Sequence, residues 1–274
     1  MSENHNTFDR LSFSDMRRMV DDRDTDGKTF FLGHDFAMIK GYNKVFDNIL
    51  NRKAPFLVED SRFLLLMRGE ADVTVNLINR RFHAGMLIYV GRGSVAQINR
   101  VSHDFMPHGM LMGDDFLNLA FDGRLPVSLC GSESSFHMLL SEHDMAVLSG
   151  MMRVIWGVVH QTPFCRDAVL GMASAFVNYA DWLRQRQINS PVNVRSRGRE
   201  VFERFITLVN THCRDERQLS FYAGRMCMCE RYLGTLVRKA SGVTAKEWID
   251  RAVVTAAKVM LCHTRMPVGE IAYR

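Results

Sequence analysis

The polar and apolar positions along the chain divide it into three parts, and the first part alternates as β-strands do. In "ADVTVNLI", Val73, Val75 and Leu77 share one side, and the residues between them are polar. This period of two predicts a half-buried strand. Before and after it stand the apolar runs "FLLLM", "MLIYV" and "SVAQI", separated by "RGE", "NRR" and "GRGS", which suit tight turns. Short strands at this spacing over residues 55–128 predict a small β-barrel or sandwich.

The apolar residues of these strands leave two interpretations open. Leu65, Val73, Val75 and Tyr89 are expected inside the barrel. There they either form an ordinary core or line a cavity for a small-molecule effector. The sequence identifies no ligand, so cofactor-binding residues are unknown and no cofactor is expected.

The second part has a helical period. In "SEHDMAVLSGMMRVIWGVVHQ", Ser141 and Asp144 have the spacing of a helix cap. Apolar residues then recur at helical intervals, and after a break at Pro163 the pattern resumes in "RDAVLGMASAFVNYADWLRQRQ". Two largely apolar helices beside a small β-domain predict either a homodimer interface or packing within the chain. The polar, basic stretch "RQRQINSPVNVRSRGRE" is typical of a linker.

The third part is predicted to be all helical, with breaks near 214–217, 227–229, 241–243 and 264–266. Short helices joined by short turns are typical of helix-turn-helix modules. Gly242 is expected at a helix C-terminus. Thr244 and Glu247 have the spacing of a capping box, which predicts a further helix that runs to about His263.

A helix over residues 230–240 has two distinct faces. Leu233, Leu236, Val237 and Ala240 form a face expected to be buried. The opposite face carries Arg231, Gly234, Thr235 and Arg238, with Lys239 at its margin. Arginine can donate two hydrogen bonds to guanine, and threonine can contact a base or a thymine methyl group. Arg238 and Lys239, near the C-terminal end, suit phosphates.

Two cysteines precede this helix, and we interpret them as residues of its turn that also serve as small core residues. Cys227 and Cys229 are separated by one residue, whereas zinc modules usually present C-x₂₋₄-C pairs. The adjacent His212 and Cys213 cannot easily both face one ion. No metal site and no redox pair are therefore expected, and Cys229 takes the N-cap position, where Ser or Thr would be better.

The charge of the chain is concentrated at one end. Residues 192–274 contain 15 Lys and Arg against 8 Asp and Glu, whereas residues 1–191 contain 20 against 22. This asymmetry favours a polyanion-binding module joined to a neutral one. The alternative is a solvated basic face without a partner.

The stretch "FYAGRMCMCERYLGTLVRKASGVTAKEWIDRAVVTAAKVMLCHTRMPVGEIAYR" resembles the DNA-binding domain of AraC-type transcription regulators. The matching pieces are Ala223, "YL", "KASGVT", "WIDRA" and "EIA". The resemblance implies two helix-turn-helix units joined by a long helix, each placing a recognition helix in a major groove. It places DNA contacts on Arg231, Gly234, Thr235, Arg238 and Lys239, in agreement with the two faces of helix 230–240.

The chain departs from the family at two substitutions and at its end. Val253 stands where the family often has an arginine, and Cys229 replaces the usual serine cap. After "EIAYR" the family would continue through its second recognition helix, so the second helix-turn-helix unit is expected to be incomplete.

Together these observations predict an α+β protein. The expected domains are a β-barrel or sandwich (1–135), a helical dimerisation segment with a linker (136–191), and an all-α helix-turn-helix domain (192–274). The resemblance implies that the first of these is cupin-like and responds to an effector. The predicted function is sequence-specific binding of double-stranded DNA by a dimeric transcription regulator. The alternative is a truncated regulator that dimerises, binds DNA poorly and acts through protein–protein contacts.

Other classes of protein lack support in the sequence. We find no P-loop, dinucleotide fingerprint or Ser/His/Asp arrangement, so no catalytic residues are expected. His83, His103 and His108 do not have the spacing of a cupin metal site and are expected at the surface or hydrogen-bonded. No apolar run reaches 18 residues, and the charged N-terminus has no signal-peptide core. A cytoplasmic protein with reduced cysteines and no membrane partner is expected.

Overall fold

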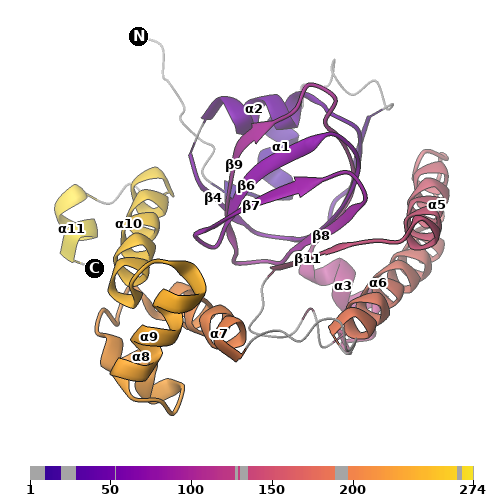
Figure 1. Ribbon diagram of the computed structural model, residues 1–274. Helices are drawn as coiled ribbons and strands as arrows, with labels where there is room; N and C mark the ends of the chain where they lie inside the picture. The colour runs from indigo at the N-terminus through magenta and orange to yellow at the C-terminus, as the bar shows by residue number, and fades with distance from the viewer. Residues whose placement is uncertain are drawn as a thin grey trace, which may run out of the picture. The chain divides into compact units, whose positions relative to one another are not determined.

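The computed structural model describes residues 10–19, 29–52, 54–126, 129, 135–188, 197–263 and 267–273. The chain forms two compact units, built mainly from residues 10–189 and 190–274 (Figure 1). The first unit contains the β-sheets and the second is helical. The predicted α+β class is therefore confirmed.

Two sheets form the β-structure of the N-terminal unit. One has the order β1 (Arg10–Leu11), β4 (Phe56–Val58), β9 (Val95–Val101), β6 (Glu70–Val75), β7 (Ile78–His83). The other has the order β11 (Ser135–Leu139), β8 (Met86–Val90), β5 (Ser61–Arg68), β10 (Met106–Met112), β3 (Phe36–Lys40), β2 (Phe30–Leu32). All pairings in this second sheet are antiparallel.

The six-stranded sheet is apolar on both faces. Leu66 and Ile88 point into a core shared with the five-stranded sheet, whereas Leu65 and Tyr89 belong to a core shared with helices. Because side chains alternate along a strand, a run such as "FLLLM" supplies both cores. Leu65 and Tyr89 were expected inside the barrel together with Val75. This was wrong, because both side chains lie on the helix-covered face of the six-stranded sheet, whereas Val75 lies in the core between the two sheets.

The N-terminal unit has helices α1 (Phe13–Met19), α2 (Lys44–Arg52), α3 (Asp114–Ala120), α5 (Glu142–Val159) and α6 (Arg166–Ile188). The predicted cap of α5 is present, because Asp144 N donates to Ser141 Oγ at 3.1 Å. The buried side of α5 and α6 packs within the chain, against the six-stranded sheet. The segment predicted as helical from residue 136 begins instead with strand β11.

The C-terminal unit consists of α7 (Arg197–His212), α8 (Leu219–Arg225), α9 (Glu230–Ser241), α10 (Ala245–His263) and α11 (Val268–Tyr273). One core joins the apolar sides of α7, α8, α9 and α10. None of the helices in the described ranges is long and apolar enough to cross a membrane.

Candidate nucleic-acid interface

The turn between α8 and α9 is fixed by backbone hydrogen bonds. Met228 N donates to Ala223 O at 2.9 Å, and Cys227 N donates to Gly224 O at 3.1 Å. This is the bond pattern of a Schellman motif, whose C′ residue is left-handed and usually glycine. Here Cys227 holds that position with φ 55°. The cysteines thus belong to the turn, as expected, but both are exposed, so the expectation of small core residues was wrong.

Helix α9 begins and ends close to its predicted bounds. Cys229 is the N-cap residue and makes no side-chain capping bond, while Gly242 ends the helix with φ 75° and donates from its N–H to Arg238 O at 2.8 Å. Leu233 and Val237 are completely buried. Ala240 was also assigned to the buried face, but it is exposed, because the last turn of α9 extends beyond the core.

The exposed side of α9 carries three cations. Arg231, Arg238 and Lys239 are all exposed. Within the described part of the chain, no ion pair or side-chain hydrogen bond engages any of the three. Their charge is therefore open to an external anion.

Cations on the neighbouring helix α10 are in a different situation. Lys246 Nζ lies 2.8 Å from Asp250 Oδ1, and Arg251 Nη2 lies 2.6 Å from Glu247 Oε1. Although exposed ion pairs of this kind contribute little to stability, they neutralise the positive charge of α10 locally. The positive potential of this unit is consequently less compensated on α9 than on α10.

Thr235 and Gly234 offer different chemistry from the cations. Thr235 is exposed, and its hydroxyl donates to Arg231 O at 2.8 Å, so it can still accept a hydrogen bond and present its methyl group. Gly234 is half-buried, and a Cβ at this position would lie 3.9 Å from Leu219 Cδ2 of α8. A side chain at position 234 would therefore point toward α8 at least as much as toward solvent.

A hydroxyl group ties the end of α9 to the start of α10. Ser241 Oγ donates to Val237 O at 2.8 Å and accepts a hydrogen bond from Trp248 Nε1 at 2.9 Å. The first turn of α10 is capped by Thr244, whose Oγ1 accepts from Glu247 N at 3.2 Å. The first half of the predicted capping box is thus present. The Glu247 side chain does not complete it, because it pairs with Arg251 on the same helix.

Two exposed residues near this face were not singled out from the sequence as contact residues. Tyr232 on α9 is 45% exposed, next to Arg231. Arg225, at the end of α8, is exposed, and its guanidinium carbon lies 5.4 Å from the centroid of the Phe221 ring. An exposed aromatic ring beside a cation is the signal that could have identified them.

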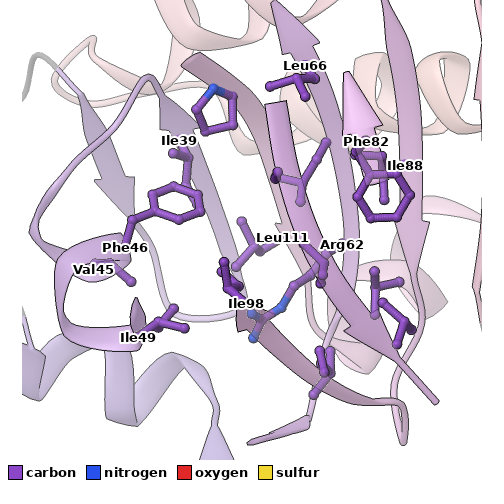
Figure 2. Close-up of a pocket in the computed structure, with 18 of the residues that line it drawn as sticks. Ile39, Val45, Phe46, Ile49, Arg62, Leu66, Phe82, Ile88, Ile98 and Leu111 are labelled. Atoms are coloured by element: carbon purple, nitrogen blue, oxygen red, sulfur yellow. The ribbon is translucent and has the colours of Figure 1, made fainter. Parts of the chain in front are cut away.

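The interior between the two sheets of the N-terminal unit is almost entirely apolar. It contains a void of about 90 Å³ lined by side chains such as Phe46, Leu66 and Ile88, with the guanidinium of Arg62 among them (Figure 2). Arg62 forms an ion pair with Asp60, whose side chain is 1% exposed. Burial raises the pKa of Asp60, and the adjacent Arg62 opposes that shift.

The described residues contain no group of three or more His, Cys, Asp and Glu side chains that could hold a metal ion. Cys213 is buried in the helical core, and burial raises the pKa of its thiol. His212 packs against the Phe221 ring, with centroids 5.2 Å apart.

Similarities to known proteins are confined to solved structures, because no protein-family model and no curated protein matches the chain. The chain is similar to ToxT from Vibrio cholerae O395, at 13% identity and a TM-score of 0.35, over 90% of this chain and 87% of that one. It is similar to unsaturated fatty acid bound wild-type ToxT from Vibrio cholerae strain SCE256 at 14% identity and a TM-score of 0.34, over 90% of this chain and 86% of that one.

A third structure of this kind is the AraC-like transcriptional activator CuxR. The identity is 11% and the TM-score 0.32, over 81% of this chain and 77% of that one. Similarities at this level of identity and TM-score carry no functional argument.

Proposed function

We propose that this chain is a DNA-binding transcription regulator of the AraC type, without catalytic activity, in which α9 enters the major groove. The observation that carries the proposal is the exposed face of α9. It combines Arg231, Arg238 and Lys239, which make no ion pair with the described residues, with the accepting oxygen and methyl group of Thr235. Buried Leu233 and Val237 hold the opposite side of α9 in the helical core.

Different positions along α9 have different roles in this proposal. Arg231, in the first turn, donates hydrogen bonds to a base edge, and Thr235, one turn later, contacts the neighbouring base. Arg238 and Lys239 lie in the last turn and contact phosphates, which position the helix without reading sequence. Gly234 permits close approach of the helix backbone, both to α8 and to DNA.

The experiment is selection of binding sites from random duplexes, followed by affinity measurements on selected and scrambled DNA. Arg231→Ala should relax base preference at one position, with a loss of about 1–3 kcal/mol on the selected site only. Arg238→Ala should weaken binding to both duplexes alike. Arg251→Gln removes the same charge from α10, where it is paired with Glu247, and should change little. Equal losses on both duplexes from Arg231→Ala and Arg238→Ala would contradict the assigned face.

We also propose that the regulator is a homodimer formed through α5 and α6. Large apolar side chains on these helices are exposed, namely Val154 (54%), Trp182 (50%) and Ile188 (41%). Light scattering after gel filtration should give twice the chain mass, and Trp182→Glu should reduce it. A dimer that does not bind DNA would favour the alternative, a regulator that acts through protein–protein contacts; a monomer that binds DNA would contradict this interface.

An effector response is proposed for the N-terminal unit, and the void between its sheets supports it. At about 90 Å³ the void is smaller than the roughly 300–1,000 Å³ typical of ligand pockets, so a ligand there must be small or must displace side chains. Small apolar compounds should raise the melting temperature of this unit in proportion to occupancy. If none of them does, the void is ordinary core.

A further inference from the structure

A groove of about 370 Å³ lies between α5 and the strands β3, β5 and β10, on the helix-covered face of the six-stranded sheet. It is separate from the void between the sheets, which is about a quarter of its size. Methionines at 38, 67 and 152 and the indole of Trp156 supply its apolar surface. Its volume is within the roughly 300–1,000 Å³ range of small-molecule sites.

Three basic side chains line the groove, and each comes from a different element. Lys40 ends β3, His108 lies directly opposite it on β10, and Arg153 comes from α5. The lining residues that the structure describes include neither aspartate nor glutamate. Positive charge gathered without a carboxylate attracts anions.

The two permanent cations of the groove have no acidic partner in the part of the chain that the structure describes. Lys40 Nζ lies 5.6 Å from the centroid of the Trp156 ring. Among the described residues, neither Lys40 nor Arg153 forms an ion pair or a side-chain hydrogen bond. A ligand acid group can therefore reach them without displacing a protein carboxylate.

His108 adds an unused polar atom. Its Nε2 is buried and has no hydrogen-bond partner within the described structure, although the residue as a whole is half-buried. The expectation of a surface or hydrogen-bonded histidine fails at this atom. Burial, and secondly the charge of Lys40, lower the pKa of His108. A lowered pKa favours the neutral imidazole, whose Nε2 either donates or accepts one hydrogen bond, depending on the tautomer. A buried polar atom without a partner is costly, and a polar ligand group would remove that cost.

We propose that this groove binds an organic anion with a flat apolar body. Its acid group lies between Lys40 and Arg153, and its body packs against Trp156 and the methionines, which are polarisable and adapt to aromatic shapes. The site belongs to the N-terminal unit alone and does not depend on DNA binding by α9.

The test uses the full chain and the fluorescent probe 8-anilino-1-naphthalenesulfonate, an aromatic sulfonate. Its neutral analogue N-phenyl-1-naphthylamine has the same aromatic body without the charge. Lys40→Gln and Arg153→Gln should each weaken sulfonate binding about two- to fivefold and leave binding of the neutral analogue unchanged. Arg100→Gln, which removes an exposed cation from β9, is the charge control and should leave both affinities unchanged.

A steric variant tests the same site without altering charge. A Cβ at Gly150, which lines the groove, would meet no atom within 4 Å, so Gly150→Leu should fill the groove while α5 remains folded. Gly157 on the same helix also has open space and does not line the groove, which makes Gly157→Leu the matched control. Gly150→Leu should weaken sulfonate binding at least tenfold, and Gly157→Leu should not.

Three results would overturn the proposal. They are no sulfonate binding by the wild-type chain, sulfonate affinity unchanged by Gly150→Leu, and equal losses for the charged and neutral probes in Lys40→Gln and Arg153→Gln. Circular dichroism of each variant keeps loss of binding distinct from loss of folding, and the two glutamine variants alter exposed side chains that the fold does not need.

Discussion

Replacing Cys227 by glycine should stabilise the helical unit. Cys227 has φ 55°, in the region where a side chain costs roughly 1–2 kcal/mol. Glycine removes that cost but adds about 0.5–1 kcal/mol of backbone entropy to be lost on folding. The Cys227 thiol is exposed, so little packing is lost. The net expectation for Cys227→Gly is an increase of about 0.5–1 kcal/mol in the free energy of unfolding.

Thermal unfolding of the full chain, followed by circular dichroism, measures this change. For a unit of this size, 1 kcal/mol corresponds to about 4–8 °C in melting temperature, so Cys227→Gly should raise the transition of the helical unit by about 2–8 °C. Cys227→Val should lower it, because a β-branched residue is strained at positive φ.

The same variants distinguish a turn from a chemical site. DNA affinity should be unchanged in Cys227→Gly and Cys227→Ser, because the backbone hydrogen bonds of the turn do not involve the thiol. A lower melting temperature for Cys227→Gly together with an unchanged one for Cys227→Val would refute the left-handed assignment. Loss of DNA binding in both Cys227→Ser and Cys227→Gly would refute the interpretation of this cysteine as part of a turn.

Three further perturbations test other parts of the fold. Ser241→Ala removes the acceptor of the Trp248 indole N–H and should destabilise the helical unit by about 1–2 kcal/mol in urea unfolding; an unchanged midpoint would contradict the link between α9 and α10. Burial raises the pKa of Tyr222, so its contribution to stability is present below its unfolded pKa of about 10 and is lost as pH rises towards the folded value. Tyr222→Phe should therefore flatten the pH dependence of unfolding above about pH 10, and a slope equal to wild type would count against this. Arg166→Gln breaks a bidentate pair with Asp35, with N–O distances of 3.0 and 2.6 Å, and should cost the N-terminal unit about 1–2 kcal/mol; scanning calorimetry showing no loss would contradict it.

Much of the helical unit could be predicted from the sequence because its signals are local. The bounds of α9 follow from the period of Leu233 and Val237 and from Gly242 at the end. The positive φ of Cys227 could not be predicted, since glycine is the residue expected there. Its conformation is imposed by the backbone hydrogen bonds that connect α8 to the turn. Cysteine has no intrinsic preference for positive φ from which this conformation could have been predicted.

In the N-terminal unit the strands within residues 55–128 could be predicted, whereas β1, β2, β3 and β11 lie outside that range and were missed. The assignment of strand faces could not be predicted. A run that is apolar throughout, such as the one that contains Leu65, has no polar side chains, so its pattern does not indicate which face of the strand contacts the other sheet and which contacts helices. The groove was also beyond prediction. Lys40, His108 and Arg153 are far apart in the sequence, and they meet only because β3 and β10 pair in one register while α5 packs over them.

The most direct test of the central claim is fluorescence anisotropy of the 274-residue chain with mixed-sequence duplex DNA over a series of salt concentrations. If α9 supplies phosphate contacts, affinity should fall steeply with salt, and Arg238→Ala should reduce the slope of log K against log salt by about one. Arg251→Gln, whose parent side chain is paired with Glu247, should leave the slope nearly unchanged. Absence of binding at low salt, or the same slope for wild type and Arg238→Ala, would contradict DNA recognition by α9.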